Sequence, residues 1–149
     1  MENEFIMVKP DGVQRGLVGE VIRKLEKVGF KIIALKMIQV TQEQAEEHYA
    51  VHKGKPFYDG LMKYITSGPV VAMIVRGKEA VKVTRKLVGS TNPIDAAPGS
   101  IRGDYALDIG RNIIHAADSA ENAKIEANIY FKEEELVEYS RNDETWIYE

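Results

Sequence analysis

The most informative segment of the chain is RNIIHAADS, residues 111–119. Its two adjacent isoleucines, Ile113 and Ile114, predict a short final strand. Asp118 precedes a glutamate by three residues, a spacing typical of a helix start, so a helix is expected from there to about Phe131. This strand-to-helix turn is the last unit of the predicted fold.

His115 lies between that strand and that helix, close to the expected helix N-terminus. Helix N-termini attract phosphate groups. An imidazole is largely uncharged near neutral pH and then carries a ring lone pair that can accept a phosphoryl group. A histidine at a strand end, taken alone, is more often a structural or surface residue, so its interpretation depends on the rest of the chain.

Outward from this stretch, strand and helix patterns alternate without internal repeats or a linker. Strands are expected at Phe5–Val8, Phe30–Val40 and Val70–Val75, and helices at 17–28, 42–49, 56–65 and 78–87. Further expectations are a turn at Pro10-Asp11-Gly12, a helix stop at Gly29, a helix cap at Thr41 and a long ordered loop over residues 88–104. The pattern predicts an α+β fold, a ferredoxin-like split βαβ sandwich in which helices cover an antiparallel sheet.

Composition limits the class of protein. The 149 residues are 44% hydrophobic, which fits a single domain over 1–149 with a substantial core. The formal charge of -3 argues against a dedicated nucleic-acid or anionic-membrane surface, so a polyanionic ligand would need a local cationic pocket. The chain has no cysteine and no apolar stretch near the length of a membrane span, and a cytoplasmic location is expected.

Four segments occur in a characteristic order: Lys9-Pro10-Asp11-Gly12, Thr91-Asn92-Pro93, Ser100-Ile101-Arg102-Gly103-Asp104 and the histidine stretch. In this order and spacing the chain resembles the nucleoside diphosphate kinases, from Phe5 to Glu149. That family has the ferredoxin-like fold. The resemblance implies a ping-pong cycle in which His115 takes the γ-phosphate of a nucleoside triphosphate and passes it to a nucleoside diphosphate.

The resemblance also implies roles for other residues. It implies that cations and a hydroxyl bind the phosphates, at Lys9, Arg85, Arg102 and Thr91. It implies that Asn112 contacts the sugar and that the base stacks on Phe57 in a slot closed by Leu61 and Ile109. Glu126 matches the glutamate that orients the imidazole, and Tyr49 matches an active-site aromatic. For each of these residues, a solvated charge or plain packing is the alternative interpretation.

The family resemblance implies Mg²⁺ bound mainly by the nucleotide phosphates, so no dedicated protein cage is expected. The protein carboxylate expected to reach such an ion, through water, is Asp118. The family also assembles as hexamers or tetramers. We therefore expect a homohexamer, with a tetramer as the alternative, and contacts between subunits through the loop around Pro93 and the segment Trp146-Ile147-Tyr148.

The chain departs from the family pattern beside the histidine, where Ala116 and Ala117 replace Gly and Ser. Because the serine hydroxyl supports the glutamate in that pattern, we predict reduced turnover with activity kept. The alternative hypotheses are a nucleotide-binding regulatory or structural oligomer with weakened catalysis, and a phosphocarrier that passes the group to another protein. His48 and His52 are spaced for one helix face but lack a metalloprotease pattern, so they are expected to be incidental. No P-loop motif occurs.

Overall fold

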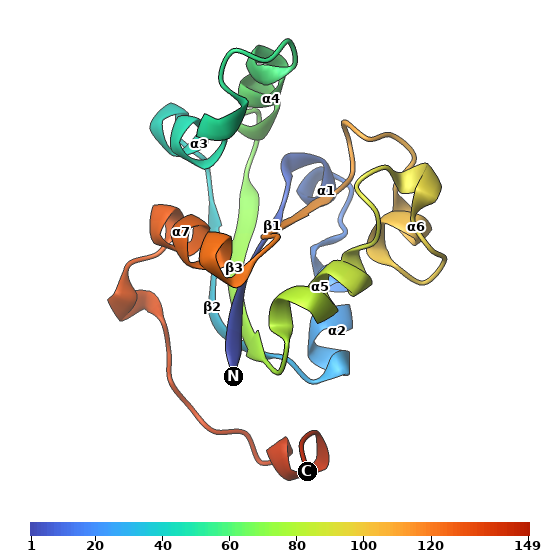
Figure 1. Cartoon of the computed structure of the whole chain (residues 1–149), viewed down its shortest axis with the longest axis vertical. Helices are drawn as coiled ribbons and strands as arrows, with labels where there is room; N and C mark the ends of the chain where they lie inside the picture. The colour runs from blue at the N-terminus through green and yellow to red at the C-terminus, as the bar shows by residue number, and fades with distance from the viewer.

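The computed structural model describes residues 1–149, and its centre is a four-stranded antiparallel sheet in the order β2-β3-β1-β4 (Figure 1). The strands are β1 (Glu2–Val8), β2 (Lys31–Ile38), β3 (Val70–Gly77) and β4 (Ile114–Ala116). β1 and β2 both pair with β3, so β3 separates the two strands of the first βαβ unit. This is the predicted ferredoxin-like arrangement.

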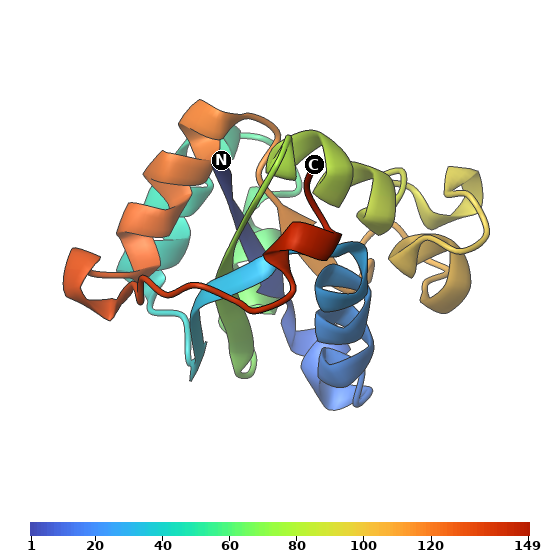
Figure 2. The ribbon, with the colours of Figure 1, turned by 90° about the horizontal axis from the view of Figure 1, so that it is seen from below.

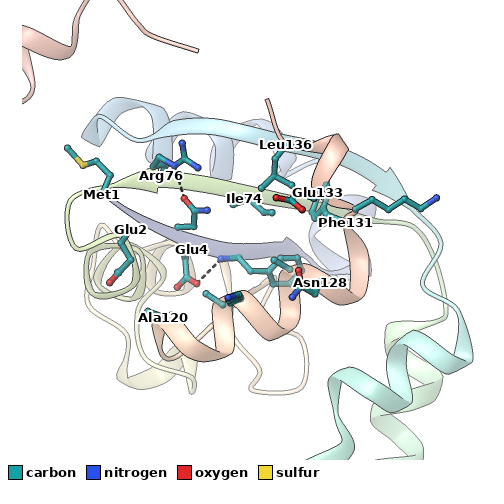
Figure 3. A pocket seen from close by; sticks show the side chains of 16 residues that line it. Met1, Glu2, Glu4, Ile74, Arg76, Ala120, Asn128, Phe131, Glu133 and Leu136 are labelled. Atoms are coloured by element: carbon teal, nitrogen blue, oxygen red, sulfur yellow. Dashed lines mark hydrogen bonds between the residues drawn. The ribbon is translucent and has the colours of Figure 1, made fainter. Parts of the chain in front are cut away.

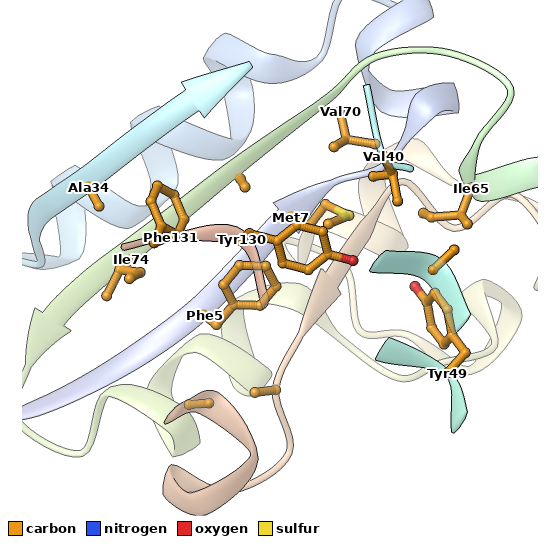
Figure 4. Close-up of a cluster of buried hydrophobic side chains, with 14 of the residues drawn as sticks. Phe5, Met7, Ala34, Val40, Tyr49, Ile65, Val70, Ile74, Tyr130 and Phe131 are labelled. Atoms are coloured by element: carbon orange, nitrogen blue, oxygen red, sulfur yellow. The ribbon is translucent and has the colours of Figure 1, made fainter. Parts of the chain in front are cut away.

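Helices cover both faces of the sheet (Figure 2). One face carries α3 (Gln42–His48), α4 (Tyr58–Ile65) and α7 (Ala120–Tyr130), and the other carries α2 (Val18–Val28) and α5 (Ala80–Val88). Alternate residues of β1 enter the two cores: Phe5 and Met7 face α3 and α7, while Ile6 and Val8 face α2 and α5. Phe5 stacks on Tyr130 in the first core, with ring centroids 5.3 Å apart (Figure 4). None of the helices is long and apolar enough to cross a membrane.

The predicted helix boundaries at Gly29 and Thr41 are confirmed. Gly29 ends α2 with a φ of 111°, which is a left-handed conformation that favours glycine. Thr41 caps α3, because its hydroxyl accepts a hydrogen bond from the Gln44 amide while the Gln44 side chain accepts one from the Thr41 amide. These ends were predictable because each depends only on adjacent residues.

Two segments expected to be irregular are helical. Pro10-Asp11-Gly12 belongs to a short helix, α1 (Pro10–Gln14), because proline at the first helical position has a suitable φ and needs no amide hydrogen bond. The loop over 88–104 contains a 3₁₀ turn, η2 (Pro93–Asp95), and runs into α6 (Ile101–Tyr105), which Ser100 caps. Short helices of this kind carry little apolar periodicity, so the sequence pattern did not reveal them.

In the predicted strand-to-helix turn, the strand starts and the helix is capped one residue later than expected. Ile113 lies before β4 with a φ of 73°, which is rare for a β-branched residue, and Ser119 rather than Asp118 caps α7. Two hydrogen bonds stabilise the strained Ile113. Its amide donates to the Asp11 carboxylate at 3.0 Å, and the carbonyl of Ile113 accepts from the Lys9 amide at 2.8 Å. Both contacts come from residues about 100 positions away, so neither could be read from the local sequence.

Further short turns occur at η1 (Ala50–His52), η3 (Glu133–Glu135) and η4 (Glu144–Trp146). The C-terminal segment that holds the last two runs back along the start of β2 (Figure 2). Arg141 donates to the Phe30 carbonyl at 2.7 Å, and the Tyr139 hydroxyl donates to the Ile32 carbonyl at 2.6 Å.

Candidate active site

A cavity of about 570 Å³ opens beside β4, and most of the residues predicted for the site line it. They come from α4, α5, α6, β4, α7 and the segments between elements: Lys9, Tyr49, Leu61, Arg85, Thr91, Arg102, Asn112, His115, Asp118 and Glu126. Phe57 and Ile109 are not part of its lining. The sheet and both helical layers therefore meet at this cavity.

His115 is the central residue of β4, opposite Met7 of β1, and its side chain is 23% exposed toward the cavity. Its Nε2 atom lies 2.8 and 3.2 Å from the two carboxylate oxygens of Glu126. Burial lowers the pKa of the imidazole, although its hydrogen bond to Glu126 acts in the opposite direction. The ring is therefore neutral at physiological pH, with one nitrogen held by the carboxylate.

His48 belongs to the site, and the prediction that it is incidental is wrong. Its side chain is 1% exposed, and its Nε2 atom lies 3.0 Å from Glu126 and 3.3 Å from Nε2 of His115. Its other ring nitrogen lies 2.7 Å from the Tyr130 hydroxyl. The spacing from buried Ala45, three residues before, is the sequence signal that could have placed His48 on the inner face of α3.

Glu126 connects the two histidines. Burial by itself would raise the pKa of this carboxyl, but hydrogen bonds from His115 and His48 bring it to about 2. The carboxylate is thus charged and has two imidazole partners. The absence of a serine hydroxyl at Ala117 predicted a weakly held carboxylate. Because His48 supplies a second hydrogen bond, Glu126 is held more firmly than that prediction implies.

Tyr49 packs against His48 rather than beneath His115. The two rings are nearly parallel, with centroids 4.3 Å apart. Burial raises the pKa of the Tyr49 phenol, so it stays protonated. This geometry favours the packing role over direct assistance to His115.

Lys9 and Asn112 form a pair on the other side of the cavity. The Lys9 ammonium donates to the side-chain oxygen of Asn112, whose amide nitrogen donates to the Thr91 carbonyl at 2.9 Å. Burial, followed by the nearby charge of Arg102, lowers the pKa of Lys9 to about 8. The ammonium is mostly charged at neutral pH and is costly to bury, which favours an anionic ligand beside it.

Arg102 and Arg85 differ in how freely they can act. Arg102 is buried and donates to the carbonyls of Gly89, Asn112 and Ile114, which ties the loop after α5 to β4. Arg85 is exposed and makes one hydrogen bond, at 3.2 Å, to the Ala116 carbonyl. Both guanidinium groups adjoin the cavity that His115 faces, and Arg85 has more donors left for a ligand.

The apolar slot predicted for a base is incomplete. Leu61 lines the cavity, whereas the side chains of Phe57 and Ile109 are 52% and 56% exposed. Phe57 lies against His52, with ring centroids 5.3 Å apart, and so borders the cavity through that residue. The structure does not bring Ile109 to the slot.

A second and larger cavity, of about 680 Å³, lies between α7 and the start of β1 and lacks His115 (Figure 3). Glu4 lines it and is fully buried, with one carboxylate oxygen bonded to the Phe5 amide and the other without a partner. Burial raises the pKa of this carboxyl to about 9. A protonated acid without an adjacent nucleophile makes this cavity a poorer candidate for phosphoryl transfer.

Comparisons with known proteins agree with this geometry. The family model described as nucleoside diphosphate kinase matches residues 2–136. A nucleoside diphosphate kinase from Archaeoglobus fulgidus is 60% identical over 100% of this chain and 99% of its own, and one from Carboxydothermus hydrogenoformans is 58% identical over the full length of both.

Among solved structures, a halophilic nucleoside diphosphate kinase from Halobacterium salinarum in complex with CDP superimposes with a TM-score of 0.96 at 47% identity, over 99% of both chains. A nucleoside diphosphate kinase from Encephalitozoon cuniculi superimposes with a TM-score of 0.95 at 40% identity, over 99% of this chain and 100% of its own. The agreement extends over sequence, fold and full length. This chain belongs to the nucleoside diphosphate kinase family.

Proposed function

We propose that this protein transfers the γ-phosphoryl group of a nucleoside triphosphate to a nucleoside diphosphate through a phosphohistidine at His115. The observation that carries the proposal is the fixed orientation of one imidazole at a cationic cavity. Glu126 holds Nε2 of His115, while Lys9, Arg85 and Arg102 line the same cavity. Family membership supports this reaction class over a regulatory oligomer without chemistry.

The hydrogen-bond chain supports a proposal for the reactive nitrogen of His115. The Glu126 carboxylate can only accept hydrogen bonds, so the His48 nitrogen that faces it must be the donor, and we propose that Nδ1 of His48 accepts from the Tyr130 hydroxyl. Nε2 of His48 then carries a proton and donates to Glu126, and Nε2 of His115 donates to the same carboxylate. The lone pair of His115 is therefore on Nδ1, and we propose Nδ1 as the nucleophile.

In the first half-reaction, Nδ1 forms a bond to the γ-phosphorus as the bond to the bridging oxygen breaks, and that oxygen keeps the electron pair. The nucleoside diphosphate leaves, and a second diphosphate reverses the step. Glu126 stabilises the positive charge that develops on the imidazole ring. Lys9 and Arg85 stabilise the charge on the moving phosphoryl oxygens, which is where most catalysis of such transfers arises.

The same geometry supports a proposal for how the nucleotide binds. Lys9, Arg85, Arg102 and the Thr91 hydroxyl are proposed to hold the phosphates, and Asn112 the sugar hydroxyl. Phe57 is proposed as a stacking platform at the cavity edge, with Leu61 inside it. Stacking tolerates any base, so CDP, the ligand of the Halobacterium salinarum relative, is an expected acceptor.

We propose Mg²⁺ as the accompanying ion, held mainly by phosphate oxygens. Asp118 is exposed at the cavity and offers a hard oxygen ligand, which fits Mg²⁺ through water. When bound, the ion supplies charge neutralisation to the phosphates. The protein residues alone would orient the nucleotide and the imidazole.

The test is to incubate the protein with γ-labelled ATP and Mg²⁺, then add unlabelled CDP. We expect an acid-labile label on the protein that moves to CDP, and no label on His115→Ala. If the label stays on the protein when CDP is added but moves to another protein, the hypothesis of a phosphocarrier is favoured. Tight nucleotide binding without any label would favour the regulatory oligomer and contradict the proposal.

We also propose that the chain assembles as a homohexamer, with a tetramer as the alternative. Three large apolar side chains are mostly left uncovered by the rest of the chain: Trp146 and Leu107 are 89% exposed, and Ile94 is 80% exposed. Sedimentation equilibrium of the protein and of Ile94→Asp would test this. The proposal predicts six or four subunits and dissociation of the variant, whereas a monomer would contradict it. The cytoplasmic location expected from the sequence stays a prediction.

A further inference from the structure

Three potential metal ligands meet in the hydrogen-bonded centre of the site. They are Nε2 of His48, Nε2 of His115 and one carboxylate oxygen of Glu126. The two nitrogens are 3.3 Å apart, and the oxygen lies 3.0 Å from the first nitrogen and 2.8 Å from the second. No other group of three histidine or acidic side chains in the chain converges in this way.

The spacing suits a small tetrahedral ion. Zn²⁺ binds imidazole nitrogen and carboxylate oxygen at about 2.0–2.2 Å, so neighbouring ligand atoms in a tetrahedral site lie about 3.3 Å apart. Expansion of the triangle by at most roughly half an ångström would accommodate the ion. Mg²⁺ prefers six oxygen ligands and would not compete for two imidazoles.

The ligands are held in place by their surroundings. The His48 ring stacks on Tyr49, and its second nitrogen contacts the Tyr130 hydroxyl at 2.7 Å, which is the kind of outer partner that orients a metal-binding histidine. The rings of His48 and His115 are nearly perpendicular, at 83°. Because His115 faces the cavity, a fourth ligand such as water can approach from that side.

We propose that a divalent transition-metal ion of the Zn²⁺ class binds His48, His115 and Glu126 and reversibly blocks phosphoryl transfer. The block follows from the position of one proton. A neutral imidazole has a single N–H, so an ion on Nε2 of His115 moves that proton to Nδ1 and removes the lone pair that attacks phosphorus. In His48 the proton moves likewise to Nδ1, which then donates to the Tyr130 oxygen. No proton is gained or lost, and a chelator restores the original state.

The cations of the cavity set the affinity. Lys9, Arg85 and Arg102 face the same space and repel a second cation, so binding should be weaker than at a structural zinc site. Metal binding itself is independent of the proposed function. The inhibitory consequence rests on that function.

Binding is tested by titrating the metal-free protein with Co²⁺ and recording its visible spectrum. We expect the intense bands of tetrahedral Co²⁺, displaced by Zn²⁺, and an affinity at least about tenfold lower in His48→Ala and Glu126→Gln. His52→Ala, in the adjoining turn, removes a histidine that is not a ligand and should retain the wild-type affinity. The weak spectrum of octahedral Co²⁺, or equal affinity in all four proteins, would overturn the proposal.

Two further measurements keep the result independent of folding and of catalysis. Imidazole ¹⁵N resonances of the unaltered protein should shift at Nε2 of His48 and His115 on adding Zn²⁺, while those of His52 stay in place. Labelling by ATP in excess Mg²⁺ should stop in the wild type with Zn²⁺ and recover when EDTA is added in an amount equal to the Zn²⁺. Labelling that persists while those resonances shift would overturn the inhibitory role. Absence of labelling without any metal would instead contradict the proposed function and leave the metal titration valid.

Discussion

At the scale of single residues, His48 determines how the site is held together. It hydrogen-bonds Glu126 on one side and the Tyr130 hydroxyl on the other, and it stacks on Tyr49. It therefore fixes both the position of the carboxylate and the tautomer of the neighbouring imidazole. In the proposed reaction it is a positioning residue that acts through Glu126.

Replacement of His48 should slow phosphohistidine formation. A hydrogen bond to a charged group contributes about 1.5–3 kcal/mol, so His48→Ala should reduce the single-turnover labelling rate roughly 10- to 100-fold. His48→Gln retains a side-chain N–H and should recover part of that loss. Rapid-quench labelling with saturating ATP gives the rates.

Glu43→Gln is the matched control, because Glu43 is exposed on the same helix, α3, and does not line the cavity. Its rate should equal that of the wild type. Equal rates for His48→Ala and the wild type would show that Glu126 needs no support from His48.

Ala117 offers a second test at this scale. Ala117 is buried in the first core, and restoring a hydroxyl there should add a hydrogen-bond donor near a carboxylate that already has two. We expect Ala117→Ser to raise the labelling rate, but by less than about fivefold, because a typical hydrogen bond contributes about 1 kcal/mol and this carboxylate already has two donors. An unchanged rate would mean that the departure from the family pattern has no effect on turnover.

At the scale of elements, the contact of α1 with β1 and with the segment before β4 positions Lys9 and Asn112. Gly12 makes this contact possible, because a Cβ at this position would lie 2.7 Å from a methyl group of Val8 and 2.9 Å from the Ile113 carbonyl oxygen. The same approach brings Asp11 within reach of the strained Ile113 amide. Close packing of α1 therefore supports the conformation that precedes the catalytic strand.

Enlarging Gly12 should separate these elements. We expect Gly12→Ala to lower the free energy of unfolding by about 1–3 kcal/mol, the usual cost of overpacking. Urea denaturation followed by circular dichroism measures it. Gly19→Ala is the control: Gly19 lies in α2 with no atom within 4 Å of its added Cβ, so the helix should gain about 0.5–1 kcal/mol. Equal stability changes in the two variants would exclude the packing argument.

At the scale of the whole molecule, the two cores share the sheet, and the acidic side chain of Glu4 on β1 is enclosed within the fold. It is fully buried, and burial raises its pKa from the usual 4.5 to about 9. Between these two values the folded protein binds a proton that the unfolded chain releases. The contribution of Glu4 to stability is complete below pH 4.5 and is lost as the pH rises through about 9.

Stability should therefore fall as the pH rises from 5 toward 9, and Glu4→Gln should reduce this fall. The amide is uncharged at every pH and has a similar shape, so the variant should be more stable than the wild type at high pH. Urea unfolding at several pH values tests this. Parallel pH profiles for the two proteins would contradict the raised pKa.

Sequence alone was sufficient for the order of the strands and longer helices, the helix ends at Gly29 and Thr41, the family resemblance and the candidate nucleophile. These depend on local periodicity, capping chemistry and short motifs, which are written in neighbouring residues. Residues with motifs of their own, such as Lys9 and Asn112, could be predicted to line the cavity of His115 for the same reason.

The tertiary structure was needed to place His48 and Tyr130 in the surroundings of His115, whereas Glu126 was already expected there from the family resemblance. His48 comes from α3, and Glu126 and Tyr130 come from α7; the two helices are separated by more than 70 residues and meet on one face of the sheet. The left-handed Ile113 and the isolated position of Ile109 likewise follow from contacts, or their absence, between distant segments. Long-range packing depends on how the whole faces of helices and sheet fit together. No local sequence pattern encodes which polar groups this packing will bring into contact.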